Sequence, residues 1–238
     1  MFEESIKPGK GTLLRKNGKQ DLIISVNKNN LNDIFLINGI NFLTENLKQT
    51  DFIIKPNQFY MVINKKYDTL KIKYSHNISN HKTIYNPYKY EFLEKNPINS
   101  LKFIKKKNVP KGYIDILSKW YSIKFTYPNH NLIYIKPEMG ISIQIHKYRS
   151  EKWEILGGNP IIINGNRIYY FVEKGRTFEN NILMYHSIIN PNKNPDEYVL
   201  IKEEWKGDFD ENDIERVYNP NNYHNYKKKR ILNTHFNR

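Results

Sequence analysis

The sequence predicts an all-β protein, built as a sandwich, barrel or jelly roll. Three observations carry this prediction. Short runs of β-branched and aromatic residues recur along the chain, separated by Asn, Gly and Pro. Aromatic residues make up 14% of the chain, which supplies material for a β-rich core. Helical periodicity is confined to two short segments, 112–119 and 210–218.

The first half is expected to contain five strands, at 21–26, 33–37, 52–55, 58–63 and 69–74. The first two are rich in Ile and Leu, and Asn-Gly follows the second as a hairpin turn. Phe-Ile-Ile and Phe-Tyr-Met-Val-Ile define the third and fourth. The fifth reads Leu-Lys-Ile-Lys-Tyr, which alternates as a strand with one buried face does.

The second half is expected to contain eight strands, each built around β-branched or aromatic residues and bounded by turn residues. They are, in order, 120–125, 132–136, 142–147, 153–156, 160–163, 167–172, 183–189 and 198–203. The third of them, Ser-Ile-Gln-Ile-His-Lys, alternates polar and apolar side chains, so one of its faces is polar.

Composition changes along the chain indicate two strand-rich domains, at 1–84 and 113–224. The segment 85–112 between them is polar, contains Pro87, Pro97 and Pro110 and includes a run of Lys at 105–107, so we expect a linker or crossover. Residues 225–238 are expected to form a disordered basic tail.

The net charge of +14 raises the question of polyanionic partners. The Lys residues are scattered more than clustered, and no RNA-binding motif accompanies them, so nucleic acid is not an expected partner. The absence of Cys excludes disulfides and thiolate catalysis. Neither a secretory signal nor a run long enough to cross a membrane is found, so we expect a cytoplasmic protein. Edge strands make a homodimer plausible.

The segment 140–153 carries the candidate chemistry. Gln144 and His146 are two apart on an expected strand and therefore point to the same face. Glu151 follows across a turn, and His186 on a later strand could supply a fourth ligand. Imidazole nitrogens with a carboxylate and an amide oxygen suit Zn²⁺, Mn²⁺ or Fe²⁺. Taken singly, His146 is also compatible with a surface strand, and His186 with a hydrogen-bonded core histidine.

The joint spacing resembles that of the cupin family. In the first cupin motif, a His-x-His pair is followed by Glu and then Gly. Here Gln144-x-His146 is followed, at matching intervals, by Glu151 and Gly158. In the second motif the Gly, His and Asn positions are occupied by Gly175, His186 and Asn190, whereas Asn181 and Leu183 replace its Pro and Gly.

With Gln in the first ligand position, this segment resembles the type II mannose-6-phosphate isomerase branch. The strands of that branch read Leu-Ser-Leu-Gln-x-His-x-x-Arg-x-Glu-x-Trp. Ile141-Ser142-Ile143-Gln144-Ile145-His146, with Arg149, Glu151 and Trp153, follows this pattern. Lys136-Pro137, Asp213-Ile214 and Arg216 also fit, and the resemblance covers roughly residues 119–218.

The resemblance implies a double-stranded β-helix, the cupin jelly-roll barrel, with one divalent metal bound by Gln144, His146, Glu151 and His186. Zinc is the metal expected first, with manganese or iron as alternatives. It also implies interconversion of mannose 6-phosphate and fructose 6-phosphate, so the expected partner is a sugar phosphate. Lys136 and Arg149 are our candidates for proton handling and phosphate contact, because Arg binds two phosphate oxygens at once.

An internal repeat suggests a bicupin whose N-terminal barrel is degenerate. Its matched pairs are the Ile-Asn-Gly turns at 37–39 and 163–165, Tyr60 and His186, and Asn64 and Asn190. An ungapped projection by 126 residues places Gly18, Gln20, Ser25 and Tyr60 at the four ligand positions. We therefore expect a metal-free first barrel.

The segment 216–223 departs from the acidic and basic residues that end the family pattern, which leaves the activity open. The first alternative is a non-catalytic or re-purposed bicupin that binds a sugar phosphate or a glycan, or that serves as a structural protein. The second is another cupin chemistry, such as a dioxygenase, which requires redox-active iron. Fold alone does not separate these functions.

Overall fold

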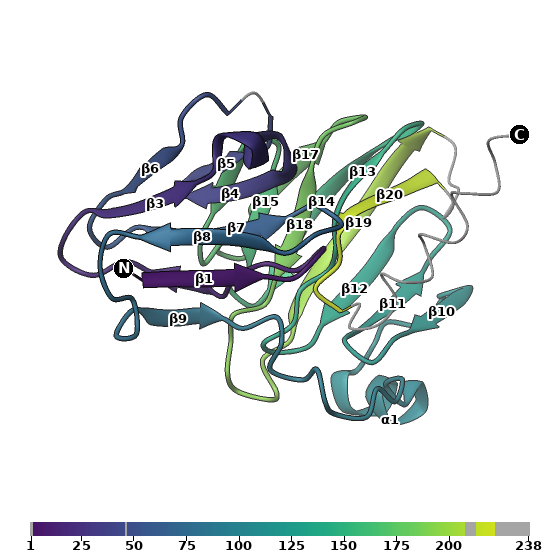
Figure 1. Cartoon of the computed structure of the whole chain (residues 1–238). Coiled ribbons are helices and arrows are strands. Elements are labelled where there is room, and N and C mark those ends of the chain that lie inside the picture. The colour runs from purple at the N-terminus through teal and green to yellow at the C-terminus, as the bar shows by residue number, and fades with distance from the viewer. Residues whose placement is uncertain (1, 46, 208–212, 222–238) are drawn as a thin grey trace, which may run out of the picture. The chain divides into compact units, whose positions relative to one another are not determined.

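The computed structural model describes residues 2–45, 47–207 and 213–221. These residues divide into two compact units (Figure 1). One holds the chain up to Tyr88 and the segment that begins at Tyr218, and the other is Lys89–Val217. The expected basic tail at 225–238 lies outside the described residues. In the described part of the chain, no helix is long and apolar enough to cross a membrane.

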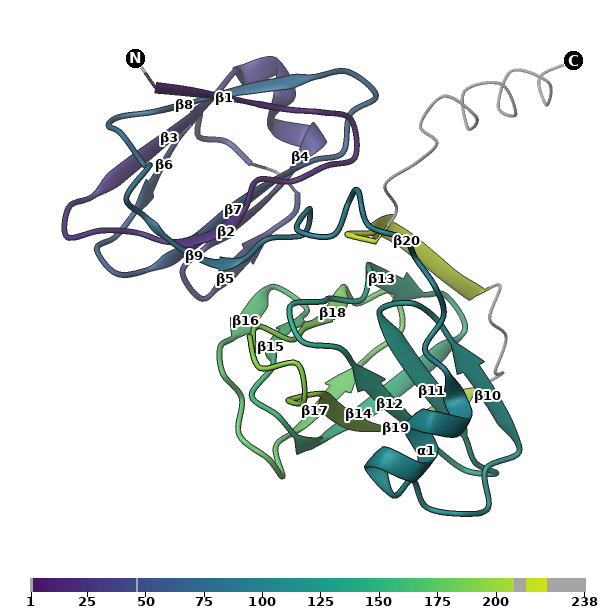
Figure 2. The ribbon, with the colours of Figure 1, turned by 90° about the horizontal axis from the view of Figure 1, so that it is seen from below.

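The first unit is built from nine strands and one short 3-10 helix. In order they are β1 (Phe2–Ile6), β2 (Leu14–Lys16), β3 (Leu22–Val26), η1 (Lys28–Asp33), β4 (Ile34–Asn38), β5 (Asn41–Leu43), β6 (Asp51–Ile54), β7 (Phe59–Asn64), β8 (Leu70–Tyr74) and β9 (Lys82–Tyr85). The strands form two layers, β1-β8-β3-β6 and β5-β4-β7-β2-β9. Figure 2 shows these layers curling around a common interior. The core cluster of this unit includes Leu36, Tyr60 and Val62 from one layer and Leu22 and Ile24 from the other.

The second unit has one helix and eleven strands. They are α1 (Ser100–Lys107), β10 (Asp115–Ser118), β11 (Ser122–Thr126), β12 (Asn131–Ile135), β13 (Ile143–His146), β14 (Arg149–Gly157), β15 (Ile161–Asn164), β16 (Arg167–Tyr169), β17 (Thr177–Asn180), β18 (His186–Ile189), β19 (Val199–Gly207) and β20 (Ile214–Tyr218). The layers are β10-β11-β12-β19-β14-β17 and β20-β13-β18-β15-β16. Trp153, Ile162 and Ile188 pack in the core between them.

Both units therefore have the antiparallel, two-layered jelly-roll architecture of a cupin, and the predicted all-β fold is confirmed. The repeat is visible in equivalent hydrogen bonds. Asn64 Nδ2 donates to the carbonyl oxygens of Ile6 and Asp68, and Asn190 Nδ2 donates to those of Ile135 and Glu197. Gly39 and Gly165 close the matching hairpins with φ of 60° and 62°, a left-handed conformation that Gly adopts readily.

The strand register corrects the ungapped projection of the ligand positions. Arg15 pairs with Tyr60 as Gln144 pairs with His186. Two residues further on, Asn17 takes the place of His146. Leu22 pairs with Ile54 of β6 as Glu151 pairs with Asn180 of β17, so Leu22 occupies the position of Glu151. The projection to Gly18, Gln20 and Ser25 is wrong because η1 lengthens the connection between β3 and β4 in the first unit. A cation, an amide, an aliphatic side chain and a phenol thus occupy the four positions.

The helix α1 lies inside the segment expected to be a linker. Asn99 caps its N-terminus by accepting a hydrogen bond from the Lys102 amide, and the Lys run at 105–107 fills its last turn, where cations favour the helix dipole. Phe103 anchors the helix, with its ring 5.0 Å from that of Tyr134 and 6.2 Å from that of Phe125. The sheet of β11 and β12 is consequently covered on this face.

Both helices expected from the sequence are wrong. Residues 115–118 form β10, because pairing with β11 overrides the local periodicity. Residues 214–218 form β20, which lies beside β13. Residues 210–212 of the second expected helix lie outside the described part of the chain.

Candidate metal centre

Three of the four predicted ligands lie on β13 and β14, which follow one another along the chain but belong to opposite layers. Gln144 and His146 alternate with Ile145 on β13, and both are buried. Asp213 stabilises the turn that follows, because its carboxylate accepts hydrogen bonds from the amides of Lys147 at 2.8 Å and Tyr148 at 3.2 Å. The chain then continues along β14, where the carboxylate of Glu151 lies against the imidazole of His146.

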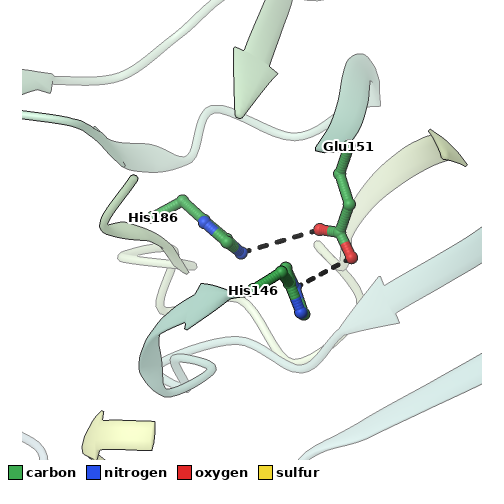
Figure 3. A group of neighbouring side chains, drawn as sticks. All are labelled: His146, Glu151 and His186. Atoms are coloured by element: carbon green, nitrogen blue, oxygen red, sulfur yellow. Dashed lines mark ion pairs between the residues drawn. The ribbon is translucent and has the colours of Figure 1, made fainter. Parts of the chain in front are cut away.

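The fourth predicted ligand comes from β18, where His186 lies in register with Gln144. Glu151 faces both imidazoles from one side (Figure 3), with Oε1 2.9 Å from His146 Nε2 and Oε2 3.6 Å from His186 Nε2. One potential ligand atom from each of His146, Glu151 and His186 lies within 4.8 Å of the others. The cluster can therefore hold a metal ion.

His186 is held in the form that a metal requires. Its Nδ1 donates to the carbonyl oxygen of Met184 at 2.8 Å, so Nε2 carries the lone pair that faces the cluster. Burial lowers the pKa of His186 to about 4, against the opposing influence of Glu151. The imidazole is consequently neutral at neutral pH, and a neutral imidazole is the state that coordinates a metal.

Glu151 indicates most directly that a cation fits. Its Oε2 is buried and has no hydrogen-bond partner among the described residues. Burial alone would raise the pKa of Glu151, but the hydrogen bond with His146 and the charges of His186 and Arg149 lower it to about 2. A buried, ionised carboxylate with an unpaired oxygen costs free energy unless a cation binds it.

Gln144 presents its amide nitrogen to the cluster, 3.4 Å from His186 Nε2, while its oxygen accepts a hydrogen bond from Ser142 Oγ. Coordination through the oxygen requires a half-turn of the amide. Ser142 tolerates this turn, because a hydroxyl group both donates and accepts.

The two residues expected to handle protons and phosphate, Lys136 and Arg149, differ in their position relative to the cluster. Arg149 is 2% exposed and lies in the cluster itself, donating from Nε to Glu151 Oε1 at 3.1 Å, with Nη1 3.6 Å from Asp213 Oδ2. Lys136 follows β12, is half-buried and is not among the described residues that line the cavity beside the cluster. Only Arg149 of this pair therefore reaches the candidate site.

That cavity opens beside Gln144, Arg149 and Glu151, and the sequence interpretation did not assign its remaining polar residues. Lys119, Lys124 and Arg216 bring three further cations to its wall. They lie on separate strands or connections. Arg216 fits the family pattern inferred from the sequence, and Lys119 and Lys124 were given no role. The cavity is therefore suited to a polar, anionic ligand.

Glu203 is an acidic residue of the cavity wall to which the sequence interpretation gave no role. It lies on β19 in register with Trp153, whose Nε1 donates to its Oε2 at 3.1 Å. Asn131 Nδ2 donates to Oε1 at 2.8 Å. Burial, together with the charge of Glu151, raises the pKa of Glu203 to about 7, against Lys124 and the two hydrogen bonds. A charged residue in the buried alternation Val199-Ile201-Glu203 was the signal available in the sequence.

Comparison with known proteins bears on the segment that holds this cluster. Residues 119–219 match the family model described as mannose-6-phosphate isomerase C-terminal. This segment is similar to that family. The resemblance inferred from the sequence is thereby confirmed, over the same residues. The match spans 101 residues, 119 to 219, of the 238 in the chain, and the first barrel lies outside it. No curated protein matches the chain.

Solved structures provide distant similarities. A cupin-superfamily sugar phosphate isomerase from Silicibacter pomeroyi is 11% identical with a TM-score of 0.32, covering 37% of this chain and 60% of its own. A point mutant of Bacillus subtilis oxalate decarboxylase is 10% identical with a TM-score of 0.35, covering 87% and 68%. CapF from Staphylococcus aureus, a capsular polysaccharide assembling protein, is 17% identical with a TM-score of 0.35, covering 52% and 32%. No function is carried over from similarities at this level.

Proposed function

We propose that the second unit is a metal-dependent sugar-phosphate isomerase that interconverts mannose 6-phosphate and fructose 6-phosphate. The observation that carries the proposal is the convergence of His146, Glu151 and His186 within 4.8 Å beside a cavity lined by cations. The family match over residues 119–219 supports the reaction class.

The four predicted ligands would hold one divalent ion, for which zinc is the first candidate because two imidazoles and a carboxylate suit it. When bound, the ion would supply Lewis acidity that stabilises negative charge developing on the sugar oxygens. The protein supplies the remaining parts: Arg149 orients the carboxylate of Glu151, and Lys119, Lys124 and Arg216 attract the phosphate.

Direct measurement of metal content tests the first half of the proposal. The purified protein should carry about one equivalent of Zn, Mn or Fe by inductively coupled plasma mass spectrometry, before or after reconstitution. The double variant Gln144→Ala/His186→Ala should carry none. His130→Ala is the matched control, because His130 stacks on Tyr127 away from the cluster. Protein that never binds metal would refute the proposed centre.

An assay for fructose 6-phosphate formed from mannose 6-phosphate, on protein loaded with each metal, tests the second half. Turnover by the loaded wild type and its loss in the double variant are the expected results. Retained metal without turnover would instead support a second function, a binder of a sugar phosphate or glycan. Arg149 favours that alternative, since its guanidinium already occupies a place in the ligand cluster.

A further inference from the structure

Glu203 is a buried carboxyl that has no place in the proposed metal centre. It is only 7% exposed, yet it contributes to the wall of the same cavity as Gln144, Arg149 and Glu151. It comes from β19, between β12 and β14 and on a different strand from every proposed ligand. It therefore combines burial with access to whatever the cavity holds.

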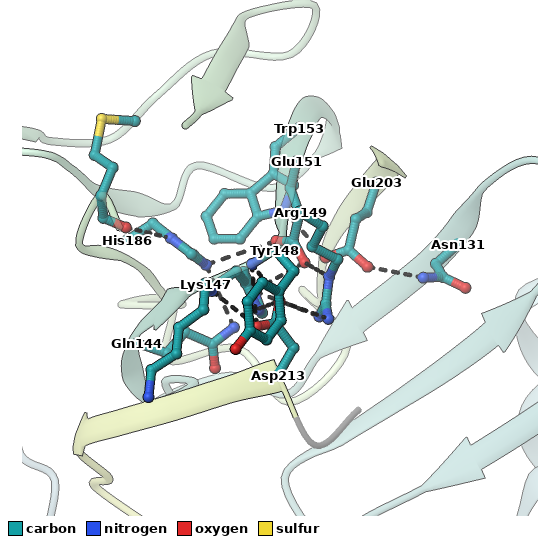
Figure 4. Close-up of polar contacts among 12 residues, drawn as sticks. Asn131, Gln144, Lys147, Tyr148, Arg149, Glu151, Trp153, His186, Glu203 and Asp213 are labelled. Carbon is teal, nitrogen blue, oxygen red and sulfur yellow. Dashed lines mark hydrogen bonds and ion pairs between the residues drawn. The ribbon is translucent and has the colours of Figure 1, made fainter. Parts of the chain in front are cut away.

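The two neighbouring strands fix the orientation of this carboxyl. Asn131 of β12 and Trp153 of β14 are both fully buried, and each donates one hydrogen bond to a different oxygen of Glu203 (Figure 4). Each oxygen keeps a second lone pair. The charged groups that act on Glu203 from the packed elements are Glu151 on β14 and Lys124 on β11. A carboxyl held in this way is oriented before any ligand arrives.

Other titratable groups of the cavity wall are less suited to moving a proton. Arg149 and Arg216 each carry a guanidinium, which offers hydrogen-bond donors and no acceptor. Glu151 is engaged with His146 and with Arg149. Burial raises the pKa of Tyr121 above its usual value near 10, so its phenol stays protonated near neutral pH. The pKa of Glu203, by contrast, lies close to neutrality, where one group can both accept and return a proton.

We propose that Glu203 is the catalytic acid–base group of the isomerisation, an inference that rests on the proposed function. Its carboxylate takes the proton from C2 of the open-chain aldose phosphate, and the C–H electron pair forms the double bond between C1 and C2. The carbonyl oxygen at C1 gains the negative charge and then the proton that leaves the hydroxyl at C2. Glu203 returns its proton to C1, which yields the ketose and restores the carboxylate.

The variant Glu203→Gln is expected to fold, because Asn131 can adapt to it. Asn131 Oδ1 has no hydrogen-bond partner in the described structure. A turned Asn131 amide can accept from the Gln amide, while the Gln oxygen still accepts from Trp153. Glu203→Asp keeps the carboxyl but shortens it by one methylene. The two variants thus separate acid–base chemistry from structural support.

The test compares these variants with the wild type, all loaded with the same metal. We expect metal content and KM for mannose 6-phosphate to be kept, and kcat to fall by about 10²- to 10⁴-fold in Glu203→Gln. Glu203→Asp should retain more activity than Glu203→Gln, whereas a purely structural role predicts the reverse order. Glu204→Gln, the next residue on the same strand, should leave kcat unchanged.

The pH dependence of kcat provides a second test of the role of Glu203. We expect kcat to fall as the pH drops below about 7, and this limb to vanish in Glu203→Gln. We use kcat because free phosphate monoesters themselves titrate near pH 6. An active Glu203→Gln variant with an unchanged pH profile would overturn this inference and leave the proposed function standing. A metal-loaded wild type without turnover would overturn both.

Discussion

The carboxylate of Asp213 lies beside the imidazole of His146, with Oδ2 3.7 Å from Nδ1, and both side chains are almost fully buried. Nδ1 of His146 has no hydrogen-bond partner among the described residues. In the structure Nε2 donates to Glu151 at 2.9 Å. A bound ion would need the lone pair of Nε2, and Nδ1 would then donate to Asp213. Carboxylates in this position orient histidine ligands and increase their basicity.

Replacing Asp213 by Asn should therefore weaken metal binding without removing any proposed ligand. We expect a loss of about 10- to 100-fold in affinity, measured by competition with a chromogenic chelator. In ¹⁵N-labelled, metal-loaded protein, the protonated nitrogen of His146 should be Nδ1 in the wild type, and its resonance should shift in Asp213→Asn. Asp196→Asn is the control, because Asp196 is an exposed partner of Lys106. Equal affinity in Asp213→Asn and the wild type would contradict this role.

A second prediction concerns stability and Glu203. Its pKa is about 7 in the folded protein against 4.5 in the unfolded chain, so the folded protein binds more protons between these pH values. Its contribution to the free energy of unfolding consequently decreases as the pH rises from 4.5 to 7. Gln does not titrate, so Glu203→Gln should gain on the order of 2–3 kcal/mol relative to the wild type across this range.

Urea denaturation of the metal-free proteins at pH 5 and pH 8 checks this prediction, with Glu204→Gln as control. The difference in the free energy of unfolding between Glu203→Gln and the wild type should favour the variant more at pH 8. A difference that does not change with pH would show that Glu203 titrates at an ordinary pKa.

The sequence predicts strands well where alternation reflects burial. β3 and β8 alternate buried and exposed residues, and both were expected. Strands such as β17, Thr-Phe-Glu-Asn, contain too few apolar residues to be recognised locally and form because they pair with β14. β10 forms a hairpin with the adjacent β11 against the local helical periodicity, whereas β20 forms by pairing with the distant β13. Such pairing is not encoded in any short window of the sequence.

The same distinction holds for the candidate site. Gln144, His146 and Glu151 are close in sequence, so strand alternation and family spacing locate them. Glu203 lies near the site because it is in register with Trp153, fifty residues away. Asp213 lies near the site because it contacts the β13–β14 turn. Neither belongs to a local motif that predicts a contact with the cluster. The three-dimensional arrangement was needed to find both.

The third prediction concerns Asn190, whose hydrogen bonds have equivalents in both units, and its contribution to stability. It is fully buried, donates to the carbonyl oxygens of Ile135 and Glu197, and accepts from the amide of Asn192. Asn190→Ala leaves these backbone groups without partners, and we expect a loss of about 2–4 kcal/mol in the free energy of unfolding. Asn129→Ala, at an exposed position, is the control in thermal and urea denaturation. A loss below about 0.5 kcal/mol would mean that water replaces these bonds.

The fourth prediction concerns the cations of the cavity wall and the phosphate. Arg216 is exposed on β20 and lines the cavity with Lys119 and Lys124. If Arg216 binds the phosphate, Arg216→Gln should raise KM for mannose 6-phosphate about tenfold, since a charge-assisted hydrogen bond contributes roughly 1.5–3 kcal/mol. The value of kcat should change little, because the interaction is the same in the ground state and the transition state.

Steady-state kinetics at two salt concentrations measure this effect. KM should rise with salt in the wild type and rise less in Arg216→Gln, because screening acts on the charge that the variant lacks. Arg167→Gln on β16 removes an exposed cation that is absent from the cavity wall and should leave KM unchanged. Equal KM values in Arg216→Gln and the wild type would place the phosphate elsewhere. A fall in kcat instead would indicate that Arg216 acts on the reacting end of the sugar.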